Sequence, residues 1–238
     1  MLVRRDDLTA LLRNRDFSLV RIRFFCDLMF ATWQPSGFGV NALRPQRTRL
    51  PTLPKSARRA QIEAGRASDD NQQMLEITEV ADDKSLRACL EVIHVAFGTV
   101  AAAHGWTRDT VPDYTAFLPW ADYQAQARSG GRVFAAVRDG RIVGCATLLA
   151  SRRTPHRFLL EKLAVLPDAR HGGVGRRLVQ RVAAEACALE GDTLGIAIVD
   201  EEVVLKNWYL ALGFVQVRTA TYAHLPFAVG YLDLSLAP

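Results

Sequence analysis

The sequence has few cysteines, no cluster of metal-binding residues and no long apolar run. Its four cysteines, Cys26, Cys89, Cys145 and Cys187, lie tens of residues apart without a CxxC pair. A disulfide framework and a metal site are therefore disfavoured, and reduced thiols in a cytoplasmic protein are expected. The apolar run from Ile142 to Ala150 is about half of the roughly 18–20 residues that a membrane helix needs, so we expect no membrane span.

Neither composition nor charge points to an unusual class of protein. The 238 residues are 49% hydrophobic and 23% charged, an average globular composition that excludes wholesale disorder. The net charge of +5 arises in residues 1–73, which hold 13 Lys and Arg against 7 Asp and Glu, whereas the remaining residues hold 17 against 18. A nucleic-acid partner is therefore disfavoured for the rest of the chain.

The chain divides near Met74 into two parts of different character. Residues 41–73 contain three prolines, many arginines and no strong hydrophobic period. Such a segment buries too little apolar surface to offset its conformational entropy. We expect residues 1–73 to be a basic, largely disordered extension that function does not need, and residues 74–238 to be the functional domain.

From Met74 onward, strand and helix patterns alternate. The dipeptide Asp139-Gly140 predicts a tight hairpin, Asp82 or Asp83 can cap the first helix, and Gly191 ends a later one. The order predicts a mixed α/β (α+β) layered domain. The expected strands span residues 75–80, 132–137, 141–149, 158–165, 193–199, 214–217 and 229–234, and the expected helices begin near Lys84 or span residues 122–128, 175–190 and 202–212.

A glycine-rich turn between a strand and a helix is the most informative segment. It runs from Leu163 to Leu178 and contains Gly172, Gly173 and Gly175. Free N–H groups at a helix start, together with the helix dipole, form an anion site that suits phosphate or pyrophosphate. The segment matches neither a P-loop nor a dinucleotide-binding fingerprint. Taken alone, these glycines are equally compatible with a simple tight turn.

Two motifs in order resemble the GNAT superfamily of acyl-CoA-dependent N-acetyltransferases. Arg170-His-Gly-Gly-Val-Gly175 fits the family's Q/R-x-x-G-x-G/A signature, and the stretch from Leu205 to Phe214 resembles its aromatic-Tyr-x-x-x-Gly-Phe block. The resemblance covers roughly residues 74–233. It implies a central mixed, mostly antiparallel sheet that splays after the fourth strand, with helices on both faces.

The resemblance also implies acetyl-CoA as the co-substrate and assigns residues to it. The main chain of one strand would pair with the pantetheine arm, as an added strand pairs with a sheet edge. The turn would hold the pyrophosphate. The strand residues are Leu163, Ala164 and Val165, and the turn residues are Arg170, His171, Gly172, Gly173, Val174, Gly175 and Arg176.

Tyr209 matches the tyrosine that the family often uses as a general acid toward the leaving thiolate. A phenol with a pKa near 10 is protonated at neutral pH and can donate to a developing thiolate. The alternative is a core tyrosine on the apolar face of its helix. The family often carries Asn about seven residues earlier, where this chain has Glu202.

A general base is needed because an alkyl ammonium, with a pKa near 10.4, must lose its proton before attack. Glu161 is the best candidate, since strand alternation places it on one face with Leu159 and Leu163. A lone carboxylate among apolar neighbours has a raised pKa. The alternative is a surface residue paired with Lys162 or an arginine. The weaker candidates are His94, His104 and His224.

The resulting prediction is an N-acetyltransferase that transfers acetyl from acetyl-CoA to a primary amine in a ternary complex. A non-catalytic acyl-CoA sensor is the alternative. The acceptor is a small molecule or a peptide, and a homodimer is compatible with the sequence. The loop at Gly105-Trp106 and the aromatic residues Trp120 and Tyr123 are candidates to line the acceptor site, or plain packing residues.

Overall fold

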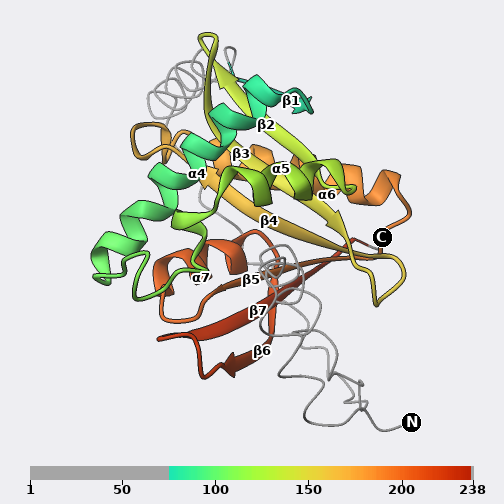
Figure 1. Cartoon of the computed structure of the whole chain (residues 1–238). Helices are drawn as coiled ribbons and strands as arrows, with labels where there is room; N and C mark the ends of the chain where they lie inside the picture. The colour runs from blue at the N-terminus through green and yellow to red at the C-terminus, as the bar shows by residue number, and fades with distance from the viewer. Residues whose placement is uncertain (1–74, 237–238) are drawn as a thin grey trace, which may run out of the picture.

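The described part of the chain, residues 75–236 of a computed structural model, begins with strand β1 (Leu75–Val80). The helix that follows is capped by Asp82, whose Oδ1 accepts a hydrogen bond from the backbone N–H of Ser85 at 2.9 Å. The later elements follow the expected order (Figure 1). They are α4 (Asp83–Ala103), η2 (Thr115–Phe117), α5 (Trp120–Arg128), β2 (Arg132–Arg138), β3 (Arg141–Ala150), β4 (Arg157–Val165), η3 (Pro167–Ala169), α6 (Val174–Ala188), β5 (Thr193–Val199), α7 (Val203–Ala211), β6 (Val215–Thr221) and β7 (Ala228–Ser235).

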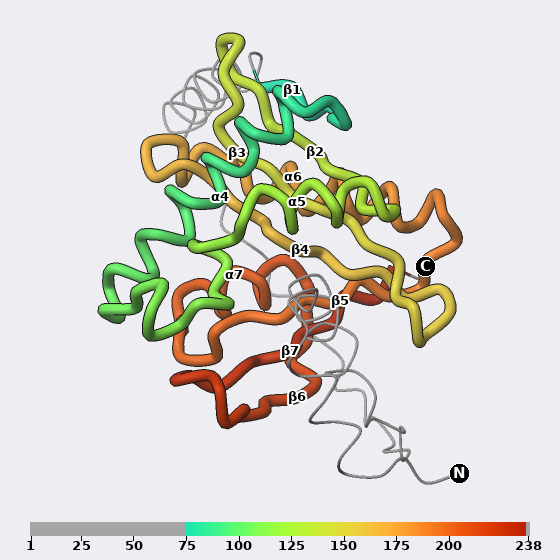
Figure 2. The backbone as a smooth tube through the Cα atoms, viewed as in Figure 1, coloured from blue at the N-terminus to red at the C-terminus, as the bar shows by residue number. Residues whose placement is uncertain are grey.

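The strands form one seven-stranded sheet in the order β1-β2-β3-β4-β5-β7-β6. Figure 2 shows its two ends, with the cyan β1 at one edge and the red β6 at the other. Every neighbouring pair is antiparallel except β4 and β5, which are parallel. The expected mixed, mostly antiparallel sheet is therefore confirmed.

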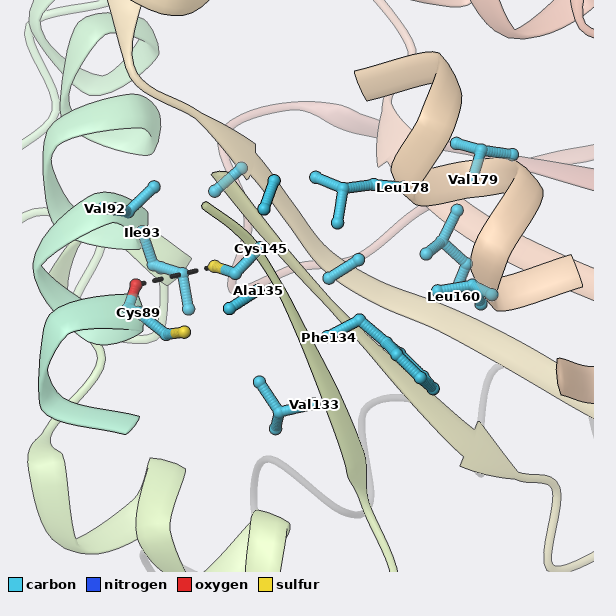
Figure 3. Close-up of a cluster of buried hydrophobic side chains, with 14 of the residues drawn as sticks. Cys89, Val92, Ile93, Val133, Phe134, Ala135, Cys145, Leu160, Leu178 and Val179 are labelled. Carbon is cyan, nitrogen blue, oxygen red and sulfur yellow. Dashed lines mark hydrogen bonds between the residues drawn. The ribbon is translucent and has the colours of Figure 1, made fainter. Parts of the chain in front are cut away.

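Helices cover both faces of the sheet because neighbouring strand residues point to opposite sides. On β3, a β-carbon at Gly144 would lie 3.0 Å from Val174 of α6, whereas the Cys145 thiol faces Cys89 of α4. Figure 3 shows the strands between α4 on one side and Leu178 and Val179 of α6 on the other. Apolar residues from both faces form the main core.

Two tight turns were predicted from glycines, and only one of the two glycines adopts a left-handed backbone. Asp139 (φ 52°) and Gly140 (φ 73°) both adopt the left-handed conformation that a two-residue hairpin needs. After α6, however, the left-handed residue is Glu190 (φ 60°), not Gly191. Gly191 is required by packing instead, since a β-carbon there would lie 2.6 Å from the ring of Phe158. The helix itself ends at Ala188, two residues earlier than expected.

One described helix, α4, is long and apolar enough by composition to cross a membrane, with a mean hydropathy of 1.5. The expectation drawn from Ile142 to Ala150 overlooked it. Seven of its residues are buried, including Leu86, Cys89 and Ile93, which belong to the main core beside the sheet. Its apolar character is that of a helix packed in a folded domain. The expected extension, residues 1–73, lies outside the described residues.

Candidate active site

The sheet opens between β4 and β5, where the resemblance places the co-substrate. The two strands pair only from Arg157 to Leu159, against Thr193 to Gly195. Beyond that point, residues 160, 161, 164 and 165 of β4 stay paired with β3, and residues 160–165 have no strand partner on the β5 side. Leu163, Ala164 and Val165 thus lie on the strand segment whose edge is left unpaired. This splay after the fourth strand confirms the predicted architecture.

The glycine turn lies at the open end of β4 and leads directly into α6. His171 (φ 64°) and Gly173 (φ 76°) both have left-handed backbones, and Gly173 is the N-cap residue. No side chain caps this helix and no acidic residue lies in its first turn. The first N–H groups therefore keep their capacity to donate to an external acceptor. Gly172, Gly173 and Arg176 are exposed, as a binding turn requires.

The side chain of Arg170 is committed within the protein. Its guanidinium donates to the carbonyl oxygens of Val165 and Ala96, both at 3.2 Å, and to Oγ1 of Thr99 at 3.1 Å. These bonds tie the turn to β4 and α4. The Nε and Nη2 donors of Arg170 are therefore engaged within the protein.

Gly175 is the point where the two sequence motifs meet. A β-carbon there would lie 3.3 Å from the ring of Trp208 on α7 and 3.7 Å from Cγ2 of Val165 on β4. A β-carbon there would require the Trp208 ring to shift by a few tenths of an ångström. Trp208 was quoted in the second motif only as an aromatic residue, and its packing on the first motif has no signal in the sequence.

Tyr209 is buried next to this junction, with 5% of its surface exposed. Its ring packs edge-on against Trp208 and Phe214, at centroid distances of 4.8 and 5.3 Å. Within residues 75–236, its hydroxyl has no hydrogen-bond partner. Burial raises the pKa of Tyr209 well above its usual value of 10. The phenol therefore stays protonated and is able to donate, while its ring serves the core.

Glu161 is not the lone carboxylate that strand alternation predicted. Its Oε2 accepts from Nζ of Lys162 at 2.7 Å and from Nε2 of Gln126 at 2.6 Å. Lys162 has a left-handed backbone (φ 51°) within a bulge between β3 and β4. An extra residue in a bulge breaks the alternation of side chains, so both side chains reach the same face. The premise of an unpaired carboxylate is wrong, because two donors stabilise its charge.

Buried polar atoms without partners surround this ion pair. They are the hydroxyl of Tyr123, Oγ1 of Thr147 and Oε1 of Gln126. Thr147 lies directly opposite Glu161 in the β3–β4 register. Burial raises the pKa of Tyr123 well above its usual value. Tyr123 is 0% exposed, so it is a packing residue and not an exposed lining residue.

The loop after α4 and the start of β7 meet in an aromatic cluster. The Trp106 ring stacks on the ring of His104, with centroids 4.4 Å apart. Its centroid lies 4.9 Å from that of Tyr114 and 4.7 Å from that of Phe227. His104 also bonds to Glu202 at 2.7 Å, which links the end of α4 to the start of α7. The position where the family often has Asn is therefore used here to join the end of α4 to the start of α7.

The other two histidines and Trp120 lie away from this arrangement. Nε2 of His94 bonds to the carbonyl of Leu118 at 2.8 Å, a structural contact. The Trp120 ring packs under the guanidinium of Arg87 at 4.0 Å. His224 follows β6, with its ring 6.0 Å from that of Tyr222. The residues 75–236 contain no group of three or more potential metal ligands.

Comparison with known proteins agrees with the fold and the turn. Residues 129–216, from the end of α5 to the start of β6, match the family model of the acetyltransferase (GNAT) domain. No curated protein sequence matches the chain. The chain is similar in structure to the ribosomal-protein-S18-alanine N-acetyltransferase of Escherichia coli, with 15% identity and a TM-score of 0.54 over 69% of this chain and 96% of that one.

Two further similar structures were solved with a cofactor. The PaiA N-acetyltransferase of Thermoplasma acidophilum, in complex with coenzyme A, is 13% identical, with a TM-score of 0.56 over 68% of this chain and 98% of that one. The candidate acetyltransferase yncA of Salmonella typhimurium, with acetyl-CoA, is 16% identical, with a TM-score of 0.53 over 69% and 95%. At these identities the structural likeness shows the fold alone.

Residues 129–216 match the acetyltransferase (GNAT) domain, and the fold of residues 75–236 is that of GNAT acetyltransferases. The matched segment includes β4, the glycine turn, α6 and α7, which carry all the residues singled out above for co-substrate and proton transfer.

Proposed function

We propose that this protein is an acetyl-CoA-dependent N-acetyltransferase that acts on a primary amine in a ternary complex. The observation that carries the proposal is the divergence of β4 from β5 immediately before an uncapped, glycine-rich helix start. An unpaired strand edge suits the amide groups of pantetheine, and the turn suits a pyrophosphate. Acetyl-CoA supplies the thioester carbonyl that the amine attacks.

Two segments of the chain bind different parts of acetyl-CoA, the main chain of β4 and the glycine turn. Leu163, Ala164 and Val165 offer backbone groups to the pantetheine arm. The N–H groups from His171 to Arg176 offer donors to the pyrophosphate. The residues present fit this co-substrate, since the helix start has neither a side-chain cap nor an acidic residue that would compete with an anion.

Tyr209 is the proposed proton donor to the leaving thiolate. Its hydroxyl is protonated at neutral pH and has no acceptor among the described residues. It follows Trp208, which packs on the turn, so α7 holds both residues next to the opening of the sheet. A positioned general acid typically contributes about 10²- to 10⁴-fold in rate.

Glu161 is the proposed proton acceptor, acting on the amine directly or through one water molecule. Lys162 and Gln126 hold the carboxylate in a fixed orientation. Deprotonating an alkyl ammonium at pH 7 requires roughly 4.6 kcal/mol, part of which is supplied by releasing the proton to solvent. We propose a cytoplasmic location, where the buried thiols of Cys89 and Cys145 stay reduced.

A thiol-release assay of the full chain with acetyl-CoA tests this function. The acceptors are alkyl amines, amino acids and peptides with free N-termini. Tyr209→Phe and Glu161→Gln are expected to lower the rate by roughly tenfold or more. Glu185→Gln is the matched control, because Glu185 is an ion-paired carboxylate 13% exposed, like Glu161 at 12%, but pairs with Arg132 and Arg181 away from the opening.

The alternative function is a non-catalytic sensor of acyl-CoA. A sensor would bind acetyl-CoA in calorimetry and release no thiol with any acceptor, and both variants would keep the wild-type affinity. Release with one acceptor class would exclude the sensor and name the substrate. Absence of acetyl-CoA binding would contradict both functions.

A further inference from the structure

Arg138, at the end of β2, lies against the glycine turn although 34 residues separate it from Gly172 in the sequence. A β-carbon at Gly172 would lie 3.2 Å from Nη2 of Arg138 and 3.9 Å from Nη1. The guanidinium therefore occupies the space that any side chain at Gly172 would need. Gly172 has no left-handed backbone, so a side chain there would require only that the guanidinium end of Arg138 shift by a few tenths of an ångström.

The guanidinium of Arg138 has no partner among residues 75–236. Its Nε is buried without a hydrogen bond, and no carboxylate pairs with it. Arg170, in the glycine turn, is by contrast engaged, because it donates to backbone carbonyls. A partly buried guanidinium with unused donors is costly unless an anionic acceptor completes it.

We propose that Arg138 is a phosphate ligand that completes the anion site of the glycine turn by binding the pyrophosphate of coenzyme A. This rests on the proposed function. The turn supplies backbone donors and a helix dipole, while the guanidinium supplies a full positive charge and paired N–H groups that suit phosphate oxygens. Because the guanidinium lies against Gly172, within the turn, it is close enough to reach a phosphate bound to the backbone there.

Calorimetric titration of the full chain with coenzyme A tests the assignment. Arg138→Met keeps much of the apolar stem and removes the guanidinium, and is expected to weaken binding by roughly tenfold or more. Arg138→Lys keeps the positive charge without the paired N–H groups of the guanidinium, and is expected to retain part of the affinity that Arg138→Met loses. Arg141→Met is the matched control, since Arg141 lies across the same hairpin but is exposed and paired with Asp168. The control is expected to change affinity less than about twofold.

Two shortened ligands identify the phosphate. If Arg138 binds the pyrophosphate, Arg138→Met lowers the affinity for 3′-dephospho-coenzyme A by the same factor as the affinity for coenzyme A. The affinity for pantetheine, which has no phosphate, does not change. A loss confined to coenzyme A would overturn the pyrophosphate assignment in favour of the 3′-phosphate. Equal affinities of wild type and Arg138→Met for coenzyme A would overturn the proposal, provided that both proteins show the same melting temperature.

Inorganic pyrophosphate separates this inference from the proposed function. Wild type is expected to gain thermal stability in millimolar pyrophosphate and Arg138→Met is not, because ligand that binds only the folded state raises the melting temperature. Stabilisation by pyrophosphate without binding of coenzyme A would retain the anion site and reject the function. Stabilisation of both proteins alike would reject Arg138 as the ligand.

A double-variant cycle gives an independent test of the contact. Gly172→Ala requires the guanidinium to shift by a few tenths of an ångström, so it is expected to weaken coenzyme A binding modestly in the wild-type background and to have little further effect in Arg138→Met. Additive losses would show that Gly172 acts through its own backbone and not through Arg138.

Discussion

Glu161 and Lys162 are adjacent in sequence, yet their side chains meet on one face of the sheet with Oε2 and Nζ 2.7 Å apart. Regular alternation would place them on opposite faces. Lys162 has a left-handed backbone and lies in a β-bulge. The extra residue of the bulge breaks the alternation and brings the two side chains together. The two side chains are 12% and 8% exposed, so this is an almost buried ion pair within the strand next to the proposed co-substrate site.

Breaking this pair from the lysine side should be costly. Lys162→Met removes the cationic donor from the nearly buried carboxylate of Glu161, and is expected to lower the free energy of unfolding by about 3 kcal/mol. Adding Glu161→Gln should recover part of that loss, because the buried charge is then gone. Denaturant unfolding measures all three variants, and strictly additive losses would show that the pair does not act as a unit.

Tyr209→Phe should separate chemistry from binding. The phenylalanine keeps the ring contacts with Trp208 and Phe214 and removes only the proton donor. We expect kcat to fall by roughly tenfold or more while the affinity for coenzyme A and the melting temperature stay near wild type. Steady-state kinetics and calorimetry measure the two quantities. A wild-type kcat would assign Tyr209 to the core alone.

Two glycines in different settings should respond to alanine in opposite directions. Gly191→Ala forces a β-carbon to 2.6 Å from Phe158 and 2.8 Å from the Ala186 carbonyl, and is expected to destabilise by about 1–3 kcal/mol. Gly98→Ala, within α4, meets no atom within 4 Å and is expected to stabilise by roughly 0.5–1 kcal/mol. Thermal unfolding of both variants checks the signs. Destabilisation by Gly98→Ala would contradict the open space seen around it.

Protonation of Glu79 should account for part of the loss of folding stability at acid pH. The two hydrogen bonds from Arg132 lower the pKa of Glu79 below its usual value of 4.5. A lowered pKa in the folded state means that the stabilisation is present above pH 4.5 and is lost as the pH falls through the folded-state pKa. Since the side chain is 40% exposed, we expect its contribution to be at most about 1 kcal/mol.

Unfolding of Glu79→Gln from pH 7 to pH 3 measures this contribution. The difference in stability from wild type should be largest near neutral pH and should shrink toward pH 3. Glu76→Gln, an exposed position on the same strand, is the control and should follow the wild-type curve. A difference that is constant with pH would show that the change acts through packing and not through ionisation.

Local patterns predicted most elements because their signals lie within a few residues. The cap at Asp82, the hairpin at Asp139-Gly140 and the amphipathic face of α6 each depend on neighbours in sequence. The errors occurred where packing overrides the local pattern. Gly191 packs against the ring of Phe158, which is distant in sequence. Lys162 breaks the alternation of side chains from which the surroundings of Glu161 were predicted.

By itself, the sequence determined the order of strands and helices, the glycine turn at the start of α6 and the likeness of both motifs to the GNAT superfamily. Only the tertiary structure decided that Arg170 is used internally, that Arg138 lies on Gly172 and that Trp208 closes on Gly175. The physical reason is that backbone conformation follows from nearby residues, whereas the partners of a side chain depend on which distant segments the sheet brings together.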